Sequence, residues 1–438
     1  MSVDWTDLAG LPDPLPIEPL AGPIPAVTVP IPGSKSITNR ALVCAALGAG
    51  PSVLTGVLDS DDTQAMIGGL RSLGIEISID ADRAEVWGCN GRLPVRSARV
   101  DVRMSGTTSR FLLPVAALAK DSVTLDGHAA MRARPMADGI AAIEALGRAV
   151  VSADGCLPIT VAPDPDVDEL AGTVEVRGDV SSQFLSGLLL VAPCLPDGLE
   201  IRVDGPLQSI PYVDMTIDVM RAFGAKVDVA DDRRWFAVEP TGYQQLTYAI
   251  EPDASAASYV LAAAALCGGS VTVDGLGSSS IQGDVRFAEV LSALGAGVDV
   301  APASITVTGS SIGGGTFDLA DISDTAQTLA ASAPFAAGPV VVHGIGFIRR
   351  KETDRIAAVV TELRRLGVDA FELDDGFRIE PGPVSGGIVQ TYDDHRMAMS
   401  FAILGLKVPG ISIADPACVA KTFPGFWAAL DRLRGTTA

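Results

Sequence analysis

The sequence predicts an α/β fold of two similar domains, each made of three copies of one repeat. Three features recur in the same order along the 438 residues, at a spacing of roughly 70 residues. They are an apolar-x-x-apolar-Gly pattern, a strand that ends in glycine, and a polar turn that opens an Ala- and Leu-rich helix. Because the three features stay in phase along the whole chain, we interpret them as one repeated structure.

The apolar-x-x-apolar-Gly pattern marks the end of the second helix of each repeat. A glycine directly after the last apolar residue adopts positive φ without steric cost, which is what a helix C-cap requires. A weaker sixth copy stands at residues 430–433, before Gly435. The five clear copies end at Gly74, Gly147, Gly224, Gly295 and Gly367.

The other two markers place a strand and a first helix in each repeat. Ser, Thr and Asp at the start of a helix are favourable N-caps. The strands end at Gly56, Gly127, Gly205, Gly275 and Gly344, with Ala414 in the sixth repeat. The first helices open near Ser36, Gly106, Ser181, Asp253, Asp324 and Asp393.

Six repeats of about 72 residues fill the chain and group naturally in threes. We expect one domain over residues 34–250 and a second, discontinuous domain over residues 1–33 and 251–438, joined at a hinge near 32–34 and 250–253. The sixth repeat reaches residue 438 before its last strand. The N-terminal segment around residues 26–29 is therefore expected to supply that strand.

Composition excludes several classes of partner and cofactor. The formal net charge of −21 disfavours nucleic acid and anionic membrane surfaces. Six scattered cysteines and three histidines show no metal-ligand spacing, and the N-terminus lacks the pattern of a signal peptide. These features predict a cytoplasmic protein with reduced thiols and no bound metal.

Features present in one repeat only are candidates for function. Lysine is rare, with six copies, and three of them stand in dense polar runs at 33–40, 349–355 and 420–423. In the first run, Lys35, Ser36 and Arg40 lie at the start of a helix, where backbone N–H groups and the helix dipole also favour an anion. The run suits a phosphate or a carboxylate, and a capped helix with a solvated charge is the alternative.

Equivalent positions in the next two repeats carry further candidates. Gly106 would let a ligand approach the backbone closely, and Arg134 precedes a proline that restricts its backbone. Helix capping is the alternative interpretation for the serines of the third repeat. The candidates there are Ser181, Ser182 and Gln183, followed in the next loop by Ser209 and Tyr212.

In the second domain, residues 351–355 are expected to open a helix with Lys351 and Arg355 on one face. Glu352 is a candidate acid, and Asp324 is either a helix cap or a general base. The sixth repeat adds His395, Arg396 and Lys421. If the repeats pack alike, these residues line a cleft between the domains that binds a ligand with several negative charges.

These residues stand in stretches that resemble the EPSP synthase family of enolpyruvyl transferases over the whole chain. The matching stretches are Pro-Gly-Ser-Lys-Ser-Ile-Thr-Asn-Arg (32–40), Gly-Thr-Thr-Ser-Arg (106–110), Arg-Pro (134–135), Ser-Ser-Gln-Phe-Leu-Ser (181–186), Lys-Glu-Thr-Asp-Arg (351–355), Asp-His-Arg-Met-Ala-Met (394–399) and Lys-Thr-Phe-Pro (421–424).

The resemblance implies a fold and an activity. Each domain would hold three βαβαββ repeats in an inside-out α/β barrel, and the domains would close about the hinge. The enzyme would transfer the enolpyruvyl group of phosphoenolpyruvate to the 5-hydroxyl of shikimate 3-phosphate, in chorismate biosynthesis. It would need no metal or organic cofactor, act as a monomer, and be inhibited by glyphosate in competition with phosphoenolpyruvate, because Gly106 leaves room.

The resemblance also implies roles for individual residues. Asp324 would accept a proton, and Glu352 would donate one, with Lys35 as the alternative donor. Shikimate 3-phosphate would be held by Lys35, Ser36, Arg40, Ser181, Ser182, Gln183, Ser209, Tyr212, Asp324 and Lys351. Phosphoenolpyruvate would be held by Lys35, Gly106, Arg134, Gln183, Arg355, His395, Arg396 and Lys421.

Three residues depart from the family pattern: Met104 and Phe347 stand where polar residues are frequent, and Phe111 stands where proline is common. Two alternatives stay open. One is the sister enolpyruvyl transferase that acts on UDP-N-acetylglucosamine, although the loop cysteine typical of it is missing between Cys89 and Cys156. The other is an inert repeat protein that binds a polyanion.

Overall fold

The computed structural model describes residues 4–167, 170–178, 181–309 and 311–435. Its internal contacts divide the chain into two compact parts. The middle domain is Gly33–Ile250, and the terminal domain combines Met1–Pro32 with Glu251–Ala438. Both are α/β, and each repeats one arrangement three times.

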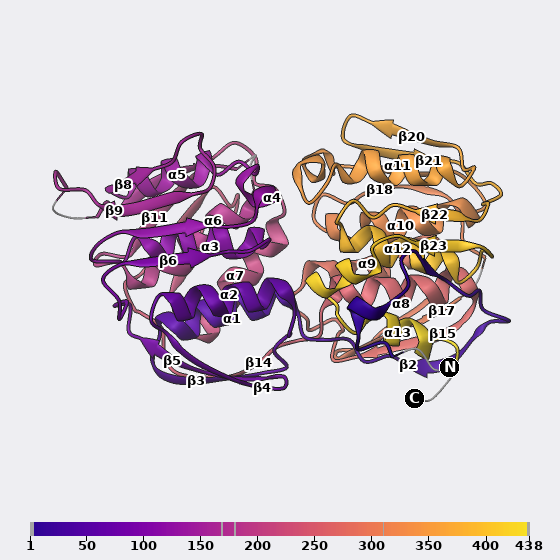
Figure 1. Ribbon diagram of the computed structural model, residues 1–438, viewed down its shortest axis with the longest axis horizontal. Helices are drawn as coiled ribbons and strands as arrows, with labels where there is room; N and C mark the ends of the chain where they lie inside the picture. Colours follow the sequence, from indigo (N-terminus) through magenta and orange to yellow (C-terminus); the bar gives the residue numbers. More distant parts are fainter. Residues whose placement is uncertain (1–3, 168–169, 179–180, 310, 436–438) are drawn as a thin grey trace. The chain divides into compact units, whose positions relative to one another are not determined.

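The middle domain contains the first three repeats (Figure 1). Its helices are α1 (Lys35–Leu47), α2 (Asp61–Ser72), α3 (Gly106–Ala116), α4 (Ala129–Arg132), α5 (Ala137–Ala145), α6 (Ser182–Val191) and α7 (Ile210–Ala222), with the 3-10 turn η2 (Ala192–Cys194). Its strands are β3 (Ala49–Thr55), β4 (Glu76–Asp80), β5 (Arg83–Cys89), β6 (Ala98–Asp101), β7 (Val123–Asp126), β8 (Arg148–Val151), β9 (Ile159–Pro163), β10 (Thr173–Arg177), β11 (Leu199–Asp204), β12 (Val227–Val229), β13 (Trp235–Val238) and β14 (Thr247–Ala249).

The terminal domain contains the other three repeats and the N-terminal segment. Its helices are α8 (Ala254–Cys267), α9 (Phe287–Ala293), α10 (Ala326–Ser332), α11 (Arg355–Arg365), α12 (His395–Gly405) and α13 (Phe426–Arg432). Its strands are β1 (Leu15–Pro16), β2 (Ile24–Thr28), β15 (Gly269–Asp274), β16 (Gly297–Val300), β17 (Ser304–Thr308), β18 (Gly315–Asp318), β19 (Val340–His343), β20 (Ala370–Leu373), β21 (Gly376–Ile379), β22 (Gly387–Val389) and β23 (Ile411–Ile413). Its 3-10 turns are η1 (Leu8–Gly10), η3 (Gly283–Arg286), η4 (Ser323–Thr325), η5 (Ala333–Phe335), η6 (Gly346–Arg350) and η7 (Pro416–Lys421).

The sheets link each repeat to the next. In the sheet of the second repeat, β7 pairs in parallel with β6, which is the last strand of the preceding repeat. On its other side, β7 pairs antiparallel with β9, and β9 pairs antiparallel with β8. The same order recurs in β10-β11-β13-β12, β14-β3-β5-β4, β16-β17-β15-β2 and β18-β19-β21-β20. Every repeat therefore donates its last strand to a neighbour.

The N-terminal segment completes the sixth repeat, as the sequence predicted. Strand β2 pairs in parallel with β15, with Thr28 opposite Thr272, which is the place that the last strand of a repeat takes elsewhere. The structure adds a second contribution that the sequence did not suggest. Strand β1 pairs antiparallel with β23, with Leu15 opposite Ile413, in the three-stranded sheet of the sixth repeat.

The first helices of the repeats form the interior of each domain. Helices α1, α3 and α6 contact one another in the middle domain, and α8, α10 and α12 do so in the terminal domain. All residues of α3, α10 and α12 are buried. Within each domain, the sheets lie outside these helices (Figure 1) and stay separate instead of closing into a barrel. The mostly apolar residues of these helices suit this interior position.

The predicted glycine caps are confirmed. Gly74, Gly147, Gly224, Gly295 and Gly367 all adopt φ between 86° and 103°, and Gly435 adopts φ 76°. Glycine takes this conformation without a Cβ clash, so the chain can turn directly from each second helix into the next strand.

One helix boundary was predicted wrongly. Residues 351–355 do not open a helix, because α11 begins only at Arg355. Asp354 has extended backbone angles and accepts a 3.0 Å hydrogen bond from the Ala357 N–H, which makes it the N-cap. Lys351 lies at the end of the 3-10 turn η6, so Lys351 and Arg355 do not share a helix face. Among the described residues, no helix is both long and apolar enough to cross a membrane.

Candidate active site

The predicted residues fall into two clusters, one in each domain. We call the first the middle-domain cluster: Lys35, Ser36, Arg40, Gly106, Arg134, Ser181, Ser182, Gln183, Ser209 and Tyr212. We call the second the terminal-domain cluster: Asp324, Lys351, Glu352, Arg355, His395, Arg396 and Lys421.

Arg40 is a buried cation in the second turn of α1, with 2% of its surface exposed. Its guanidinium donates to Thr216 Oγ1 at 2.7 Å, to the Ser36 carbonyl at 2.8 Å and to the Tyr212 carbonyl at 3.0 Å. These acceptors are neutral, and burial lowers the pKa of Arg40 to about 10. A buried guanidinium held by neutral acceptors attracts an anionic ligand strongly.

Lys35, the first residue of α1, faces a carboxylate that the sequence did not single out. Its Nζ lies 3.3 Å from Asp62 Oδ2, and the side chains are only 15% and 4% exposed. Asp62 stands in the first turn of α2, where a carboxylate is favoured by the helix dipole. The pair fixes the ammonium at the start of α1 while leaving it partly accessible.

Gly106, the first residue of α3, lies against two guanidinium groups. A Cβ at this position would stand 2.7 Å from Arg110 Nη1 and 2.9 Å from Arg134 Nη1. The Arg110 Nη1 also donates to the Gly106 carbonyl at 3.1 Å. Two cations therefore converge on a backbone that has no side chain in front of it, which suits a close approach by an anion.

Of the two serines at the start of the third repeat, one caps a helix, as the capping interpretation predicted. Ser181 is the N-cap of α6, and its hydroxyl accepts from the Gln183 N–H at 3.3 Å. Ser182 is the first residue of α6. The Gln183 amide donates to Thr107 Oγ1 at 3.2 Å, which links α6 to the first turn of α3.

Ser209 and Tyr212 open α7. Ser209 adopts φ 53°, a left-handed conformation that is unusual for serine, and its side chain does not cap the helix. The Tyr212 carbonyl accepts from Arg40, so this turn is joined directly to the first repeat. Strained backbone of this kind is typical of ligand sites.

The terminal-domain cluster is organised by Arg355, the first residue of α11. Its guanidinium lies 2.7 Å from Asp394 Oδ2, 2.7 Å from Glu352 Oε2 and 3.1 Å from Asp324 Oδ1. Burial alone would lower the pKa of Arg355, but the three carboxylates outweigh it and hold the pKa above the ordinary value. The permanently charged guanidinium of Arg355 thus holds three carboxylates in place.

Arg396, in the first turn of α12, forms a second support for Asp324. Its Nη2 lies 2.6 Å from Asp324 Oδ2, and its Nη1 donates to the Asp324 carbonyl at 3.1 Å. Nη1 also lies 3.3 Å from the hydroxyl of Tyr259, whose pKa burial raises to about 12. The N-caps of η4 and α10 are Ile322 and Thr325, and both carboxylate oxygens of Asp324 bind guanidinium groups.

Glu352 lies between two cations. Its Oε2 accepts from Arg355, and its Oε1 lies 3.6 Å from Lys421 Nζ, at the end of η7. Lys351 lies with its Nζ 5.8 Å from the centre of the Phe347 ring, so Phe347 contributes a cation–π contact where a polar residue was expected.

His395 is placed deeper than the other members, with 1% of its side chain exposed. Its Nδ1 lies 3.8 Å from Asp394 Oδ1, inside the first turn of α12. Asp394 is itself the N-cap of α12, accepting from the Arg396 N–H at 2.9 Å.

Asp284 is a buried acid that sequence reasoning missed. It lies in η3 and accepts a short hydrogen bond from the Ser255 hydroxyl in the first turn of α8. Burial, together with the charge of Asp324, raises the pKa of Asp284 to about 7. The Gln-Gly-Asp stretch at 282–284 has no repeated counterpart, and that is the signal which could have revealed it.

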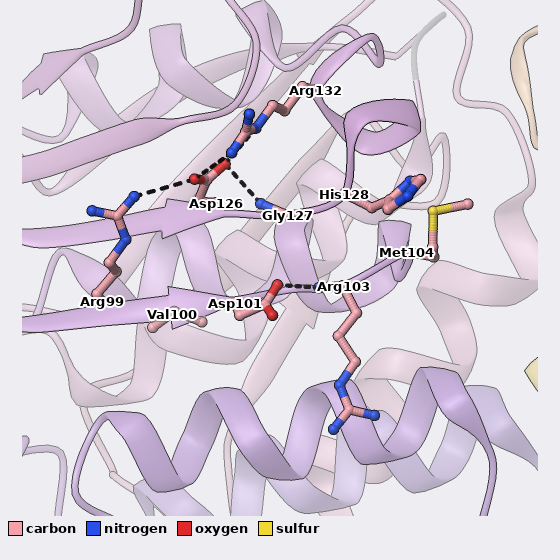
Figure 2. A pocket seen from close by; sticks show the side chains of 9 residues that line it. All are labelled: Arg99, Val100, Asp101, Arg103, Met104, Asp126, Gly127, His128 and Arg132. Carbon is pink, nitrogen blue, oxygen red and sulfur yellow. Dashed lines mark hydrogen bonds and ion pairs between the residues drawn. The ribbon is translucent and has the colours of Figure 1, made fainter.

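A surface pocket of about 650 Å³ lies near Met104 at the ends of β6 and β7 (Figure 2). Two of its three arginines are engaged by one carboxylate: Asp126 Oδ2 lies 2.8 Å from Arg132 and 3.3 Å from Arg99. None of the predicted ligand residues lines this pocket. Among the described residues, no group of three or more His, Cys, Asp or Glu could hold a metal ion.

The fold and the two clusters define a class of protein. It is a two-domain α/β enzyme of six repeats, in which non-repeated cations stand near helix starts and in the loops before the second helices, with fixed carboxylates among them. Cations at these positions bind small, multiply charged anions, and the carboxylates can accept or donate protons.

Comparison with known proteins identifies the family. The model of the EPSP synthase (3-phosphoshikimate 1-carboxyvinyltransferase) family matches residues 23–430. The chain is 43% identical to the 3-phosphoshikimate 1-carboxyvinyltransferase of Nostoc punctiforme over 420 residues, covering 95% of this chain and 98% of that one. Against the enzyme of the same name from Escherichia coli SMS-3-5, identity is 38% over 413 residues, covering 93% and 96%. The chain therefore belongs to the EPSP synthase family.

The fold agrees with a solved structure of the family. EPSP synthase from Acinetobacter baumannii superposes with a TM-score of 0.79 at 24% identity, over 95% of this chain and 97% of that chain. This similarity supports the two-domain, six-repeat architecture.

Proposed function

We propose that the chain transfers the enolpyruvyl group of phosphoenolpyruvate to the 5-hydroxyl of shikimate 3-phosphate, with release of phosphate. Membership of the EPSP synthase family supports this activity. The observation that carries the chemistry is Arg355, which holds Asp324, Glu352 and Asp394 within 3.1 Å of one guanidinium. Such an arrangement places a proton acceptor and a proton donor at fixed positions beside a cation.

The middle-domain cluster supplies most of the ligands for shikimate 3-phosphate. Arg40 and Lys35 offer positive charge at the start of α1, and the turn at Ser209 and Tyr212 is tied to Arg40. Ser36, Ser181, Ser182 and Gln183 add hydroxyl and amide groups suited to phosphate oxygens and ring hydroxyls. From the terminal domain, Asp324 and Lys351 act on the same substrate.

Phosphoenolpyruvate carries a phosphate and a carboxylate, so it needs several cations. Arg355, Arg396 and Lys421 supply them in the terminal domain. In the middle domain, Lys35 and Arg134 supply two more cations, and Gly106 and Gln183 add neutral contacts. His395, which stands next to Asp394, completes the set of phosphoenolpyruvate ligands.

The reaction proceeds in two stages. The 5-hydroxyl oxygen bonds to C2 of phosphoenolpyruvate and loses its proton to Asp324, while C3 takes a proton from Glu352. The tetrahedral intermediate then breaks its C2–O bond to phosphate, and C3 loses a proton, which restores the C2–C3 double bond. Lys35 is the alternative proton donor to C3, and the cations stabilise the charge that develops at the carboxylate and the leaving phosphate.

The proposal extends to an inhibitor and to the cellular setting. Because Gly106 leaves space before Arg110 and Arg134, we propose that glyphosate binds there in competition with phosphoenolpyruvate. We also propose that the protein works as a monomer in the cytoplasm on small anionic substrates, with no metal, cofactor, nucleic acid or membrane partner.

A phosphate-release assay tests the activity. Phosphoenolpyruvate is supplied with either shikimate 3-phosphate or UDP-N-acetylglucosamine as acceptor. We expect release with shikimate 3-phosphate only, and inhibition by millimolar glyphosate that added phosphoenolpyruvate reverses. Release with UDP-N-acetylglucosamine would favour the sister transferase, and release with neither acceptor would reject the enzyme.

A further inference from the structure

The turn that precedes α12 has an unusual backbone. The Asp394 N–H donates to the Thr391 carbonyl at 2.9 Å, and the two residues between them, Tyr392 and Asp393, adopt φ of 57° and 56°. A four-residue turn with both central residues at positive φ belongs to a type that normally contains glycine, asparagine or aspartate. Tyrosine is bulky, so its presence there is a genuine outlier.

A strained turn persists only where its surroundings hold it. The group that holds this one is the carboxylate of Glu362, which is completely buried. Its Oε1 accepts from the Tyr392 hydroxyl at 2.5 Å, and its Oε2 accepts from the Gln390 N–H at 3.0 Å. The hydroxyl stays protonated and able to donate, because burial and the hydrogen bond to Glu362 raise the pKa of Tyr392 to about 12.

Glu362 and the site residue Arg355 belong to the same helix, α11. They are seven residues apart, which is about two turns, so they lie on one face of the helix. Arg355 binds Asp394, whereas Glu362 binds Gln390 and Tyr392. Helix α11 therefore holds residues 390–394 at both ends.

The segment held in this way determines where the next residues stand. Asp394 follows the turn directly, caps α12 and contacts Arg355. Arg396 lies two residues further on and binds both the side chain and the carbonyl of Asp324. A small rotation of the turn would move all of these contacts together.

We propose that Glu362 is a positioning residue, which holds the Tyr392–Asp393 turn in its left-handed form and thereby aims Arg396 and Asp394 at Asp324 and Arg355. This inference rests on the proposed role of Arg355 and Arg396 in binding phosphoenolpyruvate.

The direct test is Tyr392→Phe, which removes one hydroxyl and leaves the ring and Glu362 in place. We expect kcat/KM for phosphoenolpyruvate to fall by about 10- to 100-fold, as for a displaced binding group. The KM for shikimate 3-phosphate should change much less. The matched control is Tyr243→Phe in the middle domain, which removes a buried hydroxyl that donates to the Leu190 carbonyl at 2.8 Å. The control should lower the melting temperature without changing either KM.

A rescue experiment separates positioning from a loss of stability alone. Glycine at position 393 adopts positive φ at no steric cost, so Asp393→Gly should make the turn less dependent on Glu362. We expect Asp393→Gly alone to keep wild-type kinetics and to restore most of the activity of Tyr392→Phe and of Glu362→Gln. Wild-type kinetics in Tyr392→Phe, or an activity loss in both variants that Asp393→Gly leaves unchanged, would overturn the proposal.

A third variant distinguishes this proposal from the site assignment on which it rests. Arg396→Lys should raise the KM for phosphoenolpyruvate whether or not Glu362 positions the turn. If Arg396→Lys has no effect, the assignment of the binding site is wrong. If it has the effect while Tyr392→Phe behaves as wild type, only the positioning role is wrong.

Discussion

At position 106 the absence of a side chain keeps space in front of two arginines. A Cβ would lie 2.7 Å from Arg110 Nη1 and 2.9 Å from Arg134 Nη1, so either guanidinium would have to move. The backbone of Gly106 is helical, and alanine therefore fits the local conformation. An alanine at position 106 should therefore weaken ligand binding more than it lowers the stability of the fold.

We therefore predict that Gly106→Ala raises the KM for phosphoenolpyruvate and the inhibition constant for glyphosate, each by about tenfold or more. The free energy of unfolding should change by less than about 1 kcal/mol. Steady-state kinetics and urea denaturation check the two parts. Unchanged inhibition by glyphosate would contradict the placement of the phosphonate at this position.

Asp284 gives a prediction about pH. Because burial raises the pKa of this carboxyl to about 7, the folded protein keeps a proton that the unfolded chain loses near the ordinary value of 3.8. The contribution of Asp284 to the free energy of unfolding is therefore lost as the pH rises from about 4 to about 7. Asn cannot titrate but still accepts from the Ser255 hydroxyl.

We expect Asp284→Asn to gain stability relative to the wild type as the pH rises across that window. Urea denaturation at pH 4.5, 6 and 7.5 measures the difference, with the exposed Asp299→Asn as control. A difference between Asp284→Asn and the wild type that does not change with pH would show that Asp284 is charged throughout.

At the scale of single residues, the sequence singled out cations more readily than the carboxylates that contact them. Rare lysines in one-copy positions pointed to Lys35, Lys351 and Lys421. Asp62 and Asp284 were missed, because a carboxylate near a helix start has the same pattern whether it caps the helix or faces a ligand. For Asp62, the structure shows what the sequence cannot: its carboxylate lies 3.3 Å from Lys35 Nζ.

At the scale of elements, the glycine C-caps allowed the repeats to be recognised in the sequence. One acidic N-cap, Asp354, led to a wrong prediction of where a helix begins. The end of each second helix was predicted correctly because positive φ strongly favours glycine. The start of α11 was placed too early, because the charged run 351–355 looks helical in isolation. Asp354 accepts the Ala357 N–H and stops the helix one residue before Arg355. Competition between neighbouring polar side chains for one cap is not visible in a pattern of residue types.

The pairing of β2 with β15 gives a prediction for one element. Gly269 adopts φ 90° where β15 meets Ile24, and a Cβ would lie 1.8 Å from the Ile24 carbonyl oxygen. Gly269→Ala should therefore destabilise the terminal domain by about 2 kcal/mol or more. The control is Gly22→Ala, where no atom lies within 4 Å of the added Cβ. Equal denaturation midpoints for the two variants would show that the N-terminal strand contributes little to the stability of the sheet.

At the scale of the whole molecule, the net charge of −21 and the anionic substrates are compatible. The total describes the average surface, whereas the clusters gather cations at a few non-repeated positions. Arg40 is held by neutral acceptors, whereas Arg355 forms ion pairs with three carboxylates at the centre of its cluster. The architecture of six repeats could be predicted from the sequence. The hydrogen bonds that turn repeated helix starts into two different clusters could not, because they join residues up to 176 positions apart.

The central claim is that these one-copy residues perform enolpyruvyl transfer on a repeated scaffold. It is tested most directly by following the proton at C3. Wild-type enzyme turning over phosphoenolpyruvate and shikimate 3-phosphate in deuterium oxide should place deuterium on C3 of the enolpyruvyl product, as read by mass spectrometry. Glu352→Gln should lower turnover by about 100-fold or more, and Lys407→Gln should match the wild type. Full turnover with deuterium incorporation in Glu352→Gln would contradict the account.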